Sequence, residues 1–573
     1  MVTLSINNQK VVVPEDTTVL EAARQINVNI PTLCHLEGLE NYGSCRICVV
    51  EIEGEPRLSP SCMRTVSEGM EISTNSKRVL KARRMIIQLL LANHAENCPT
   101  CERSQNCELQ QLAFELGVRE NHFVNMVNKV PLDMSGPAII RDPNKCISCG
   151  RCIRMCHQIQ SVGAIDFMNH GTDIMVTTAL NKGLGNVECI NCGQCIHVCP
   201  VGAITEKPHV DAVWAAIQDN TKHVVVQAAP SIRAALGEEL GLAPGTLVTG
   251  KMYAALRRLG FDAVLDTNFA ADLTIMEEAS ELVQRIKNGG ILPQLTSCCP
   301  GWIKFAEHFY PDLLPNISSC KSPQQMFGSL VKTYYAQQKK VEPAAIISVS
   351  VMPCTAKKFE AQRPEMNASG FRDVDYVLTT RELARMIKEN GLDFAGLPDE
   401  QADKLMSQYS GAATIFGTTG GVMEAALRTV YKLITGTELS HLEVQPVRGL
   451  EGIKEAKVNI NGMTVKIAVA HGMANARILL EQIRSGVSPY HFIEIMACPG
   501  GCVGGGGQPI GYDMVLRSTR GKVLYSEDTK LPLRRSHDNT EIKEIYKNFL
   551  GEPLSHKSHE LLHTTYINRR NKK

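Results

Sequence analysis

The pattern of apolar residues differs between the start of the chain and the part beyond residue 210. Near its start, apolar and polar residues alternate in TLSIN and KVVVPE, which predicts a β-hairpin, and TTVLEAARQIN then predicts a short helix that begins near a threonine. Beyond residue 210, the apolar runs HVVVQAAP, AAIISVSVMPC and HFIEIMAC are nearly continuous, and helical stretches or a glycine loop follow them. The pattern predicts small α+β modules followed by a large α/β domain with buried strands.

The ends of the buried strands carry reactive side chains. In α/β sheets, ligands bind beyond the carboxyl ends of the strands. Three of the predicted strands end at Ala-Pro-Ser, Cys354 and Cys498, and a fourth, ILPQLTSCC, ends at Cys298 and Cys299. We therefore expect one site at these ends. Because neighbours on an extended chain point to opposite faces, the two adjacent thiols should have different roles.

The length, net charge, apolar runs and cysteine content of the chain limit the classes of protein to which it could belong. A chain of 573 residues exceeds one ordinary core, and its net charge of +1 gives no reason to expect nucleic acid or a membrane as partner. The start lacks the features of a signal peptide, and no apolar run approaches the ~18 residues of a membrane span. We expect a cytoplasmic protein. Its 21 cysteines come in tight groups, which in a reducing compartment indicates metal binding.

The cysteine groups divide the chain into four segments, each a predicted domain: residues 1–79, 80–126, 127–209 and 210–573. The first resembles the plant-type 2Fe–2S ferredoxins, although its first cysteine interval of ten residues is longer than the usual four. A four-cysteine zinc site is the alternative. The expected ligands are Cys34, Cys45, Cys48 and Cys62.

The second segment has only three clustered cysteines, Cys98, Cys101 and Cys107, after the helical run VLKARRMIIQLLLANH. A histidine at a helix end is usually a capping or surface residue. Here the missing fourth donor favours His94 as a ligand of a 4Fe–4S cluster. A Cys3His zinc site is the alternative.

The third segment repeats C-x2-C-x2-C-x3-C, the signature of bacterial ferredoxins with two 4Fe–4S clusters. In that signature the last cysteine of each motif serves the other cluster. His157 follows the first motif where proline is usual, which removes no ligand. The predicted sets are Cys146, Cys149, Cys152 with Cys199, and Cys189, Cys192, Cys195 with Cys156.

The last segment contains six cysteines, two more than a cubane needs. Its glycine-rich stretch MACPGGCVGGGGQP could suggest a phosphate loop, but the glycines surround two cysteines, and they also permit close approach to an inorganic cluster. Together with LTSCCPGW and VMPCTAKKFEA, this stretch closely resembles the three active-site signatures of the FeFe-hydrogenases, in their long clostridial-type form.

The resemblance implies an H-cluster, a 4Fe–4S cubane bridged through cysteine sulfur to a diiron centre with CO, cyanide and azadithiolate. The implied cubane ligands are Cys299, Cys354, Cys498 and the bridging Cys502. Lys357 would meet one cyanide, and a solvated surface role is its alternative. The remaining implied pocket residues are Pro230 and Ser231 at the other cyanide, Met352 and Met496 against the diiron unit, and Gln324 and Phe416 as wall.

The resemblance also implies a proton relay. Its members would be Cys298, Glu278, Ser318, Glu281 and Arg285. Three of them are spaced i, i+3 and i+7 and share one helix face, which by spacing alone would favour a solvent-exposed charge stripe. The sixth cysteine, Cys320, is expected to be a small buried residue, with a redox or oxygen-response role as the alternative.

The implied activity is reversible hydrogen oxidation and proton reduction, with electrons relayed through the accessory clusters. Segments such as LGLAPGTLVTGKMYAALRRLGFD look closest to catalytic subunits of NAD(P)-linked, electron-bifurcating hydrogenases. Ferredoxin, NAD(P)- or flavin-binding iron–sulfur subunits and maturation enzymes are the implied partners. No nucleotide-binding motif is visible in this chain. The alternative is a non-catalytic iron–sulfur electron carrier or hydrogen sensor.

Overall fold

The computed structural model describes residues 1–124 and 130–570. Two compact units emerge: residues 1–158, 163–189 and 195–205 form the first, and residues 159–162, 190–194 and 206–573 form the second. This division is coarser than the predicted four domains, which remain a prediction. The predicted boundary at residues 126 and 127 lies outside the described residues. No described helix is both long and apolar enough to cross a lipid bilayer.

The first unit opens with a five-stranded sheet in the order β2-β1-β5-β3-β4. β1 (Val2–Ile6) and β2 (Gln9–Val13) form the predicted antiparallel hairpin, and α1 (Val19–Gln25) is the predicted helix. Thr18 and Glu21 close a capping box at the start of α1, which satisfies the free amide groups of its first turn. The other strands of this sheet are β3 (Val49–Ile52), β4 (Ser59–Pro60) and β5 (Glu71–Ser73).

Short elements complete the first unit and surround its cysteine motifs. The predicted long helix is α2 (Lys77–Ala92), which contacts α3 (Glu108–Glu115). Two small two-stranded sheets follow, and α4 (Arg151–Arg154) starts directly after Gly150 of the first bacterial-type motif. The strands of these sheets are β6 (Ile139–Arg141) with β9 (Ile204–Glu206), and β7 (Asp166–Met168) with β8 (Met175–Thr177).

The second unit contains a parallel sheet in the order β11-β10-β13-β14. The strands are β10 (His223–Ala228), β11 (Ala263–Asp266), β13 (Ile346–Met352) and β14 (Tyr376–Thr379). Both faces are covered: Val226 packs with residues of α8 (Thr249–Arg258) and α14 (Thr380–Glu389), and Val225 packs with residues of α9 (Thr267–Lys287) and α11 (Pro323–Leu330). The continuous apolar runs reflect this two-sided burial.

A second four-stranded sheet has the order β12-β17-β16-β15. β12 (Gln294–Leu295), β17 (Phe492–Met496) and β16 (Met463–His471) are parallel, and β15 (Ile453–Ile460) is antiparallel to β16. The predicted strand before Cys298 is thus only two residues long. Around the sheet pack α10 (Pro300–Phe309), α16 (Gly421–Thr435) and α17 (Met473–Arg484).

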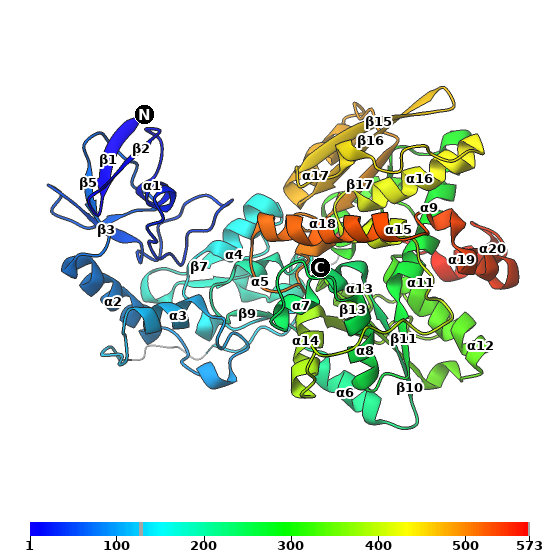
Figure 1. The fold of residues 1–573 in the computed structure, drawn as a ribbon, viewed down its shortest axis with the longest axis horizontal. Helices are drawn as coiled ribbons and strands as arrows, with labels where there is room; N and C mark the ends of the chain where they lie inside the picture. Colours follow the sequence, from blue (N-terminus) through cyan, green and yellow to red (C-terminus); the bar gives the residue numbers. More distant parts are fainter. Residues whose placement is uncertain (125–129, 571–573) are drawn as a thin grey trace. The chain divides into compact units, whose positions relative to one another are not determined.

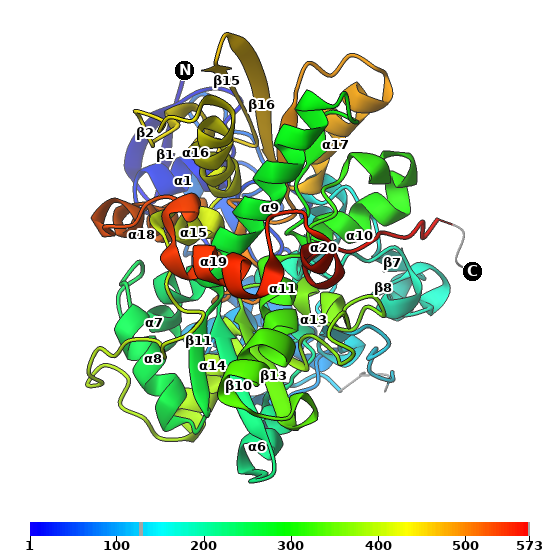
Figure 2. The same cartoon turned by 90° about the vertical axis from the view of Figure 1, so that its right-hand side faces the viewer.

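Figures 1 and 2 show α9, α15 (Gly411–Thr414) and α18 (Met514–Lys530) between the two sheets of the second unit. Smaller helices include α6 (Val210–Gln218), α7 (Leu236–Glu239), α13 (Ala356–Glu360), α19 (Thr540–Ile545) and α20 (His556–Leu562). The carboxyl ends of strands from both sheets meet at one cavity, which is described next.

Candidate active site

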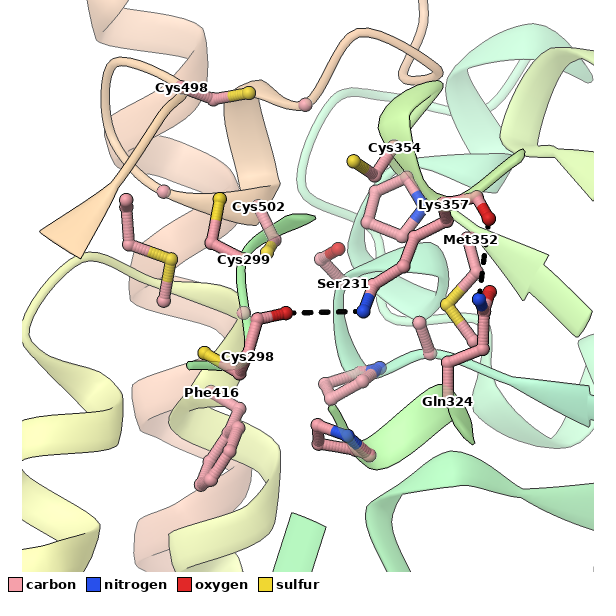
Figure 3. Close-up of a pocket in the computed structure, with 18 of the residues that line it drawn as sticks. Ser231, Cys298, Cys299, Gln324, Met352, Cys354, Lys357, Phe416, Cys498 and Cys502 are labelled. Carbon is pink, nitrogen blue, oxygen red and sulfur yellow. Dashed lines mark hydrogen bonds between the residues drawn. The ribbon is translucent and has the colours of Figure 1, made fainter. Parts of the chain in front are cut away.

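One cavity collects the ends of five strands. Residues shortly after β10, β11, β12, β13 and β17 line it. The strand-end pattern predicted four of these strands, and β11 was not among them. The cavity volume is about 80 Å³, counted as the space open to the centre of a water molecule. A bound group of several atoms therefore fits in it. Besides Cys298, its mostly apolar lining includes four further cysteines, and Figure 3 shows several of these side chains around the cavity. Such a pocket suits a compact inorganic group better than a water-soluble metabolite.

The four cysteines in question are Cys299, Cys354, Cys498 and Cys502. Burial raises the pKa of each thiol. Neighbouring cysteines raise it further in Cys354, to about 12, and in Cys498 and Cys502. Four thiolates are therefore stable here only when a metal cluster neutralises them. The donor set fits a cubane.

Glycine lets the cysteine loop close around this space. Gly501 has a φ of +87°, a conformation that other residues rarely adopt. A Cβ atom at this position would also lie 2.5 Å from the amide nitrogen of Thr419. The glycines between and after the two loop cysteines therefore serve backbone packing, as the sequence suggested, instead of a phosphate loop.

The adjacent Cys298 and Cys299 point in different directions. Figure 3 shows the Cys299 sulfur directed toward Cys502 and the Cys298 sulfur directed toward Phe416. Cys299 is the N-cap of α10, and its Sγ accepts a hydrogen bond from the Ala497 amide at 3.4 Å. The expected divergence of the two thiols is present, although their chemical roles are not tested by geometry alone.

Lys357 is buried beside Cys298, so its solvated surface alternative is wrong. Its Nζ donates to the Cys298 carbonyl at 3.1 Å and to Glu360 Oε2 at 2.9 Å, which leaves a third hydrogen for the cavity that it lines (Figure 3). Burial acts to lower the pKa of Lys357, but the Glu360 carboxylate outweighs it, so the net pKa is raised and the lysine stays charged. The neighbouring Lys358 is also buried and pairs with Glu382.

The other predicted pocket residues line the same cavity. Gln324 is fixed on both sides, since its Oε1 accepts from Ser350 at 2.8 Å and its Nε2 donates to Glu360 at 3.1 Å. Glu360 itself was not predicted, and its spacing of three residues after Lys357 on α13 is the signal that could have found it. The predicted wall residues brought together here are Pro230, Ser231, Gln324, Met352, Phe416 and Met496.

The predicted relay runs from the protein interior to the partly exposed Arg285. Ser318 Oγ donates to Glu281 Oε2 at 2.6 Å, and Arg285 Nη2 donates to Glu281 Oε1, also at 2.6 Å. Glu278 is fully buried and Glu281 is 8% exposed, so the alternative of a solvent-exposed charge stripe is wrong. Among the described residues no hydrogen bond joins Cys298, Glu278 and Ser318 to one another.

Glu278 is electrostatically unusual. Neither of its carboxyl oxygens has a hydrogen-bond partner among the described residues. Burial, and then the nearby Glu281, raise its pKa to about 8, and the Ser297 amide offsets only part of this. Burial and the charge of Glu278 in turn raise the pKa of the Cys298 thiol well above its ordinary value. Both groups are therefore neutral proton holders near pH 7.

Cys320 is fully buried, as expected. Its Sγ lies 3.9 Å from Glu281 Oε2, and burial raises the pKa of this thiol well above its ordinary value. Nothing in the structure supports the alternative role in redox or oxygen response.

The first unit brings together its predicted ligands for the 2Fe–2S cluster. Cys34, Cys45, Cys48 and Cys62 are all buried, and the Cys48 and Cys62 sulfurs are 3.4 Å apart. Hydrogen bonds from Cys45 and Cys62 lower the pKa of Cys34 to about 2. Because the thiolate is the form of cysteine that binds metals, a thiolate at Cys34 favours iron binding here.

His94 has the arrangement of a metal-binding imidazole. Its Nδ1 donates to the Lys145 carbonyl at 3.0 Å, and burial lowers its pKa, so the ring is neutral and Nε2 is the free acceptor. The three predicted cysteine partners, Cys98, Cys101 and Cys107, are half-buried.

The crossed pairing of the bacterial-type motifs is also visible. One small cavity is lined by Cys146, Cys149, Cys152 and Cys199, the predicted set. In the other set, Cys195 is electrostatically coupled to Cys189 and Cys156. Cys192, its fourth member, lies on the segment of residues 190–194, which belongs to the second unit.

Comparisons with known families match this organisation segment by segment. Residues 222–506 match the C-terminal domain of the iron only hydrogenase large subunit, and residues 514–569 match the iron hydrogenase small subunit. Residues 1–77 match a 2Fe-2S iron-sulfur cluster binding domain. Residues 83–122 and 136–205 match the NADH-ubiquinone oxidoreductase-G iron-sulfur binding region and the NADH-quinone oxidoreductase subunit 3 ferredoxin-like domain. An H-cluster domain, one 2Fe–2S domain and 4Fe–4S domains are thus all present.

Two known hydrogenases are similar to this chain over nearly its whole length. The chain is 50% identical to the NADP-reducing hydrogenase subunit HndD of Solidesulfovibrio fructosivorans over 99% of each chain. It is 46% identical to iron hydrogenase 1 of Clostridium pasteurianum, over 99% of this chain and all of the relative. A solved structure of apo FeFe-hydrogenase HydA1 from Chlamydomonas reinhardtii covers 63% of this chain and 99% of its own, with 46% identity and a TM-score of 0.57. The chain belongs to the FeFe-hydrogenase (iron-only hydrogenase) family.

Proposed function

We propose that this protein interconverts dihydrogen with protons and electrons at an H-cluster held in the five-strand cavity. The observation that carries the proposal is the meeting of four cavity-lining cysteines with Cys298 and the charged Lys357 around one apolar space. When bound, the H-cluster supplies an open iron position for hydrogen and an amine base beside it. The cubane ligands would be Cys299, Cys354, Cys498 and Cys502.

The protein would hold the diiron unit chiefly through its pocket, because Cys502 provides a single covalent link. Lys357 has one hydrogen left for a charged cyanide, and Ser231 with the backbone at Pro230 would hold the other. Met352 and Met496 add polarizable bulk without donors. Such a pocket also excludes bulk water from the reacting atoms.

Protons would move between the cavity and the surface through Cys298, Glu278, Ser318, Glu281 and Arg285. The outer half already forms a continuous hydrogen-bonded chain that ends at the partly exposed Arg285. The inner half of the relay consists of Cys298 and Glu278, both protonated near pH 7. Small side-chain rotations or a water molecule would have to connect these two groups. A carboxyl with a pKa of about 8 is well matched to such transfer near neutral pH.

Electrons would enter through the segment of residues 190–194, which carries Cys192. Thr355 Oγ1 donates to the Asn191 carbonyl at 2.7 Å, and Gln194 Nε2 donates to the Gly504 carbonyl at 2.8 Å. A Cβ atom on Gly506 would lie 2.3 Å from the Cys192 carbonyl oxygen. An accessory-cluster ligand thus rests against two loops that carry proposed cubane ligands, which supports direct electron transfer between them.

The accessory-cluster ligands are part of the same proposal. Four thiolates would hold the 2Fe–2S cluster, His94 with three cysteines would hold one 4Fe–4S cluster, and the crossed motifs would hold two more. Anaerobic reconstitution with iron and sulfide, followed by EPR of the reduced chain, would count these clusters.

As partners we propose iron–sulfur subunits that bind flavin and NAD(P), with ferredoxin as a second electron partner, in the cytoplasm. The support is the similarity to a chain named as an NADP-reducing hydrogenase subunit, and two accessory segments of NADH-quinone oxidoreductase type. Electron bifurcation belongs to this finer proposal, and maturation enzymes would supply the diiron unit. Anaerobic purification of the tagged chain from its own host tests it: a co-purifying flavoprotein supports the complex, and a tagged chain that purifies without any flavoprotein subunit contradicts it.

The activity itself is tested with the full chain produced alongside hydrogenase maturation enzymes under anaerobic conditions. We expect hydrogen evolution with a reduced viologen dye and dye reduction under hydrogen. A chain that carries all its clusters, including the diiron unit, but performs neither reaction would instead be a non-catalytic carrier or sensor.

A further inference from the structure

Helix α18 directs two buried arginines at the loop that carries Cys498 and Cys502. Arg517 Nη1 donates to the Pro499 carbonyl at 3.0 Å, and Arg520 Nη1 donates to the Val503 carbonyl at 3.0 Å. The two side chains are 1% and 2% exposed. Both therefore fasten the same loop, from positions one helical turn apart on α18.

The two arginines differ in how their charge is balanced. Arg520 forms a two-point ion pair with Glu238, at 2.7 and 2.5 Å. Arg517 instead donates to neutral acceptors, the Pro499 carbonyl and Gln194 Oε1 at 3.3 Å, and its guanidinium lies over the Tyr512 ring. It forms no ion pair with any carboxylate in residues 1–124 or 130–570.

The Asp513 carboxylate favours the charged form of Arg517 only weakly, less than Cys498 does, and a buried cation without a paired counter-charge is costly, by several kcal/mol before compensation. The group able to supply that counter-charge is the cluster beside Cys498. Arg517 and Cys498 each favour the charged form of the other. A cubane held by four thiolates is anionic and gains another negative charge on reduction, and the potentials of such clusters follow their net charge, hydrogen bonds and burial.

We propose that Arg517 is a redox-tuning residue, whose uncompensated guanidinium stabilises the reduced form of the cubane beside Cys498 and raises its reduction potential. The inference rests on the cubane ligands of the proposed function. Lys357, on the other side of the cavity, is already paired with Glu360 and is a weaker source of net positive charge.

Gln194 connects this charge to the path of incoming electrons. Its side chain is fully buried, accepts from Arg517 and donates to the Gly504 carbonyl, and it lies two residues after Cys192. The guanidinium is therefore held between the cysteine loop and the segment of residues 190–194. A cation there favours the electron on the cubane over the electron on the accessory cluster.

The test is a redox titration of the matured full chain, followed by EPR and by the infrared bands of the diiron ligands. Arg517→Gln removes the charge, and Arg517→Lys keeps it with different hydrogen bonds. The matched control is the double variant Arg520→Gln with Glu238→Gln, which removes a hydrogen bond to the same loop and leaves the net charge unchanged.

In Arg517→Gln, at the wild-type midpoint potential, we expect the ratio of reduced to oxidised cubane to fall at least tenfold, equivalent to about 59 mV for one electron. Arg517→Lys and the double variant should stay within about threefold of the wild type. An unshifted Arg517→Gln, or an equal shift in Arg517→Lys or in the double variant, would overturn the proposal, because loop packing would then be the cause.

Failure of assembly is also informative. If Arg517→Gln does not load the cubane and Arg517→Lys does, the charge requirement is supported, and if neither loads it, the proposal is overturned. The titration needs no hydrogen turnover. A shifted potential in a chain that does not turn over hydrogen would therefore refute the proposed function and leave the role of Arg517 standing.

Discussion

Glu278 offers the sharpest prediction about proton transfer. Its carboxyl is fully buried, has no hydrogen-bond partner among the described residues, and has its pKa raised from the ordinary 4.5 to about 8 by burial and by Glu281. At about 1.4 kcal/mol per pH unit, this corresponds to roughly 5 kcal/mol against the ionised form. At pH 7 the protonated form therefore exceeds the ionised form about tenfold, and at pH 9 the ratio is reversed.

The pH dependence follows from that ratio. Hydrogen evolution needs a protonated Glu278 to deliver a proton, so its contribution falls as pH rises through about 8. Hydrogen oxidation needs the ionised form to accept one, so its contribution rises over the same range. Glu278→Gln cannot transfer a proton and should lose about 10² to 10⁴-fold in both directions, together with the inflection near pH 8. Glu278→Asp keeps the acid and should retain intermediate activity.

The assay is dye-linked hydrogen evolution and oxidation between pH 6 and 9, normalised to assembled diiron centre by infrared absorption. Glu277→Gln is the matched control, since this neighbouring carboxylate is held by Tyr546 at 2.5 Å and by His563 at 3.1 Å, outside the relay. It should keep wild-type turnover per assembled site. If Glu278→Gln also turned over at more than a third of the wild-type rate, the relay assignment would be refuted.

Four further substitutions test separate parts of the site. Cys298→Ala should keep the full iron content and lose at least 100-fold in turnover. Cys299→Ala should lose about six irons per chain by elemental analysis, those of the cubane and of the diiron unit bridged to it. The same loss in both would contradict their separate roles. His94→Ala should remove one accessory 4Fe–4S signal from the EPR spectrum and leave the diiron infrared bands in place; an unchanged spectrum would exclude this ligand. In Gly506→Ala, the new Cβ would lie 2.3 Å from the Cys192 carbonyl oxygen and should displace it. Electron transfer from a protein donor should then slow at least severalfold, while the infrared bands of the diiron ligands stay unchanged. Unchanged rates would contradict the proposed entry route.

Much of the site could be predicted because cysteine spacing is a direct record of cluster geometry. The crossed set of Cys146, Cys149, Cys152 and Cys199 follows from the resemblance to two-cluster bacterial ferredoxins, in which the last cysteine of each motif serves the other cluster, and the structure places all four around one cavity. The strand-end rule likewise located the active-site cavity, since parallel strands deliver the residues after them to one edge.

Burial and pairing could not be predicted in the same way. Spacing on α9 placed Glu278 and Glu281 on one face but could not show that this face is covered by other parts of the chain. Arg517 and Gln194 are 323 residues apart, and their contact exists only after the chain has folded. A lysine such as Lys357 reads as a surface residue until the position of Glu360 is known.

The central claim is that the five-strand cavity holds an H-cluster through its four cysteines. Infrared spectroscopy of the anaerobically matured chain tests it most directly, because carbon monoxide and cyanide ligands absorb where protein does not. We predict carbonyl and cyanide bands in the wild-type protein that shift when hydrogen is added and that are absent from Cys502→Ala. A matured wild-type chain without such bands, or a Cys502→Ala variant that retains them unchanged, would contradict the account.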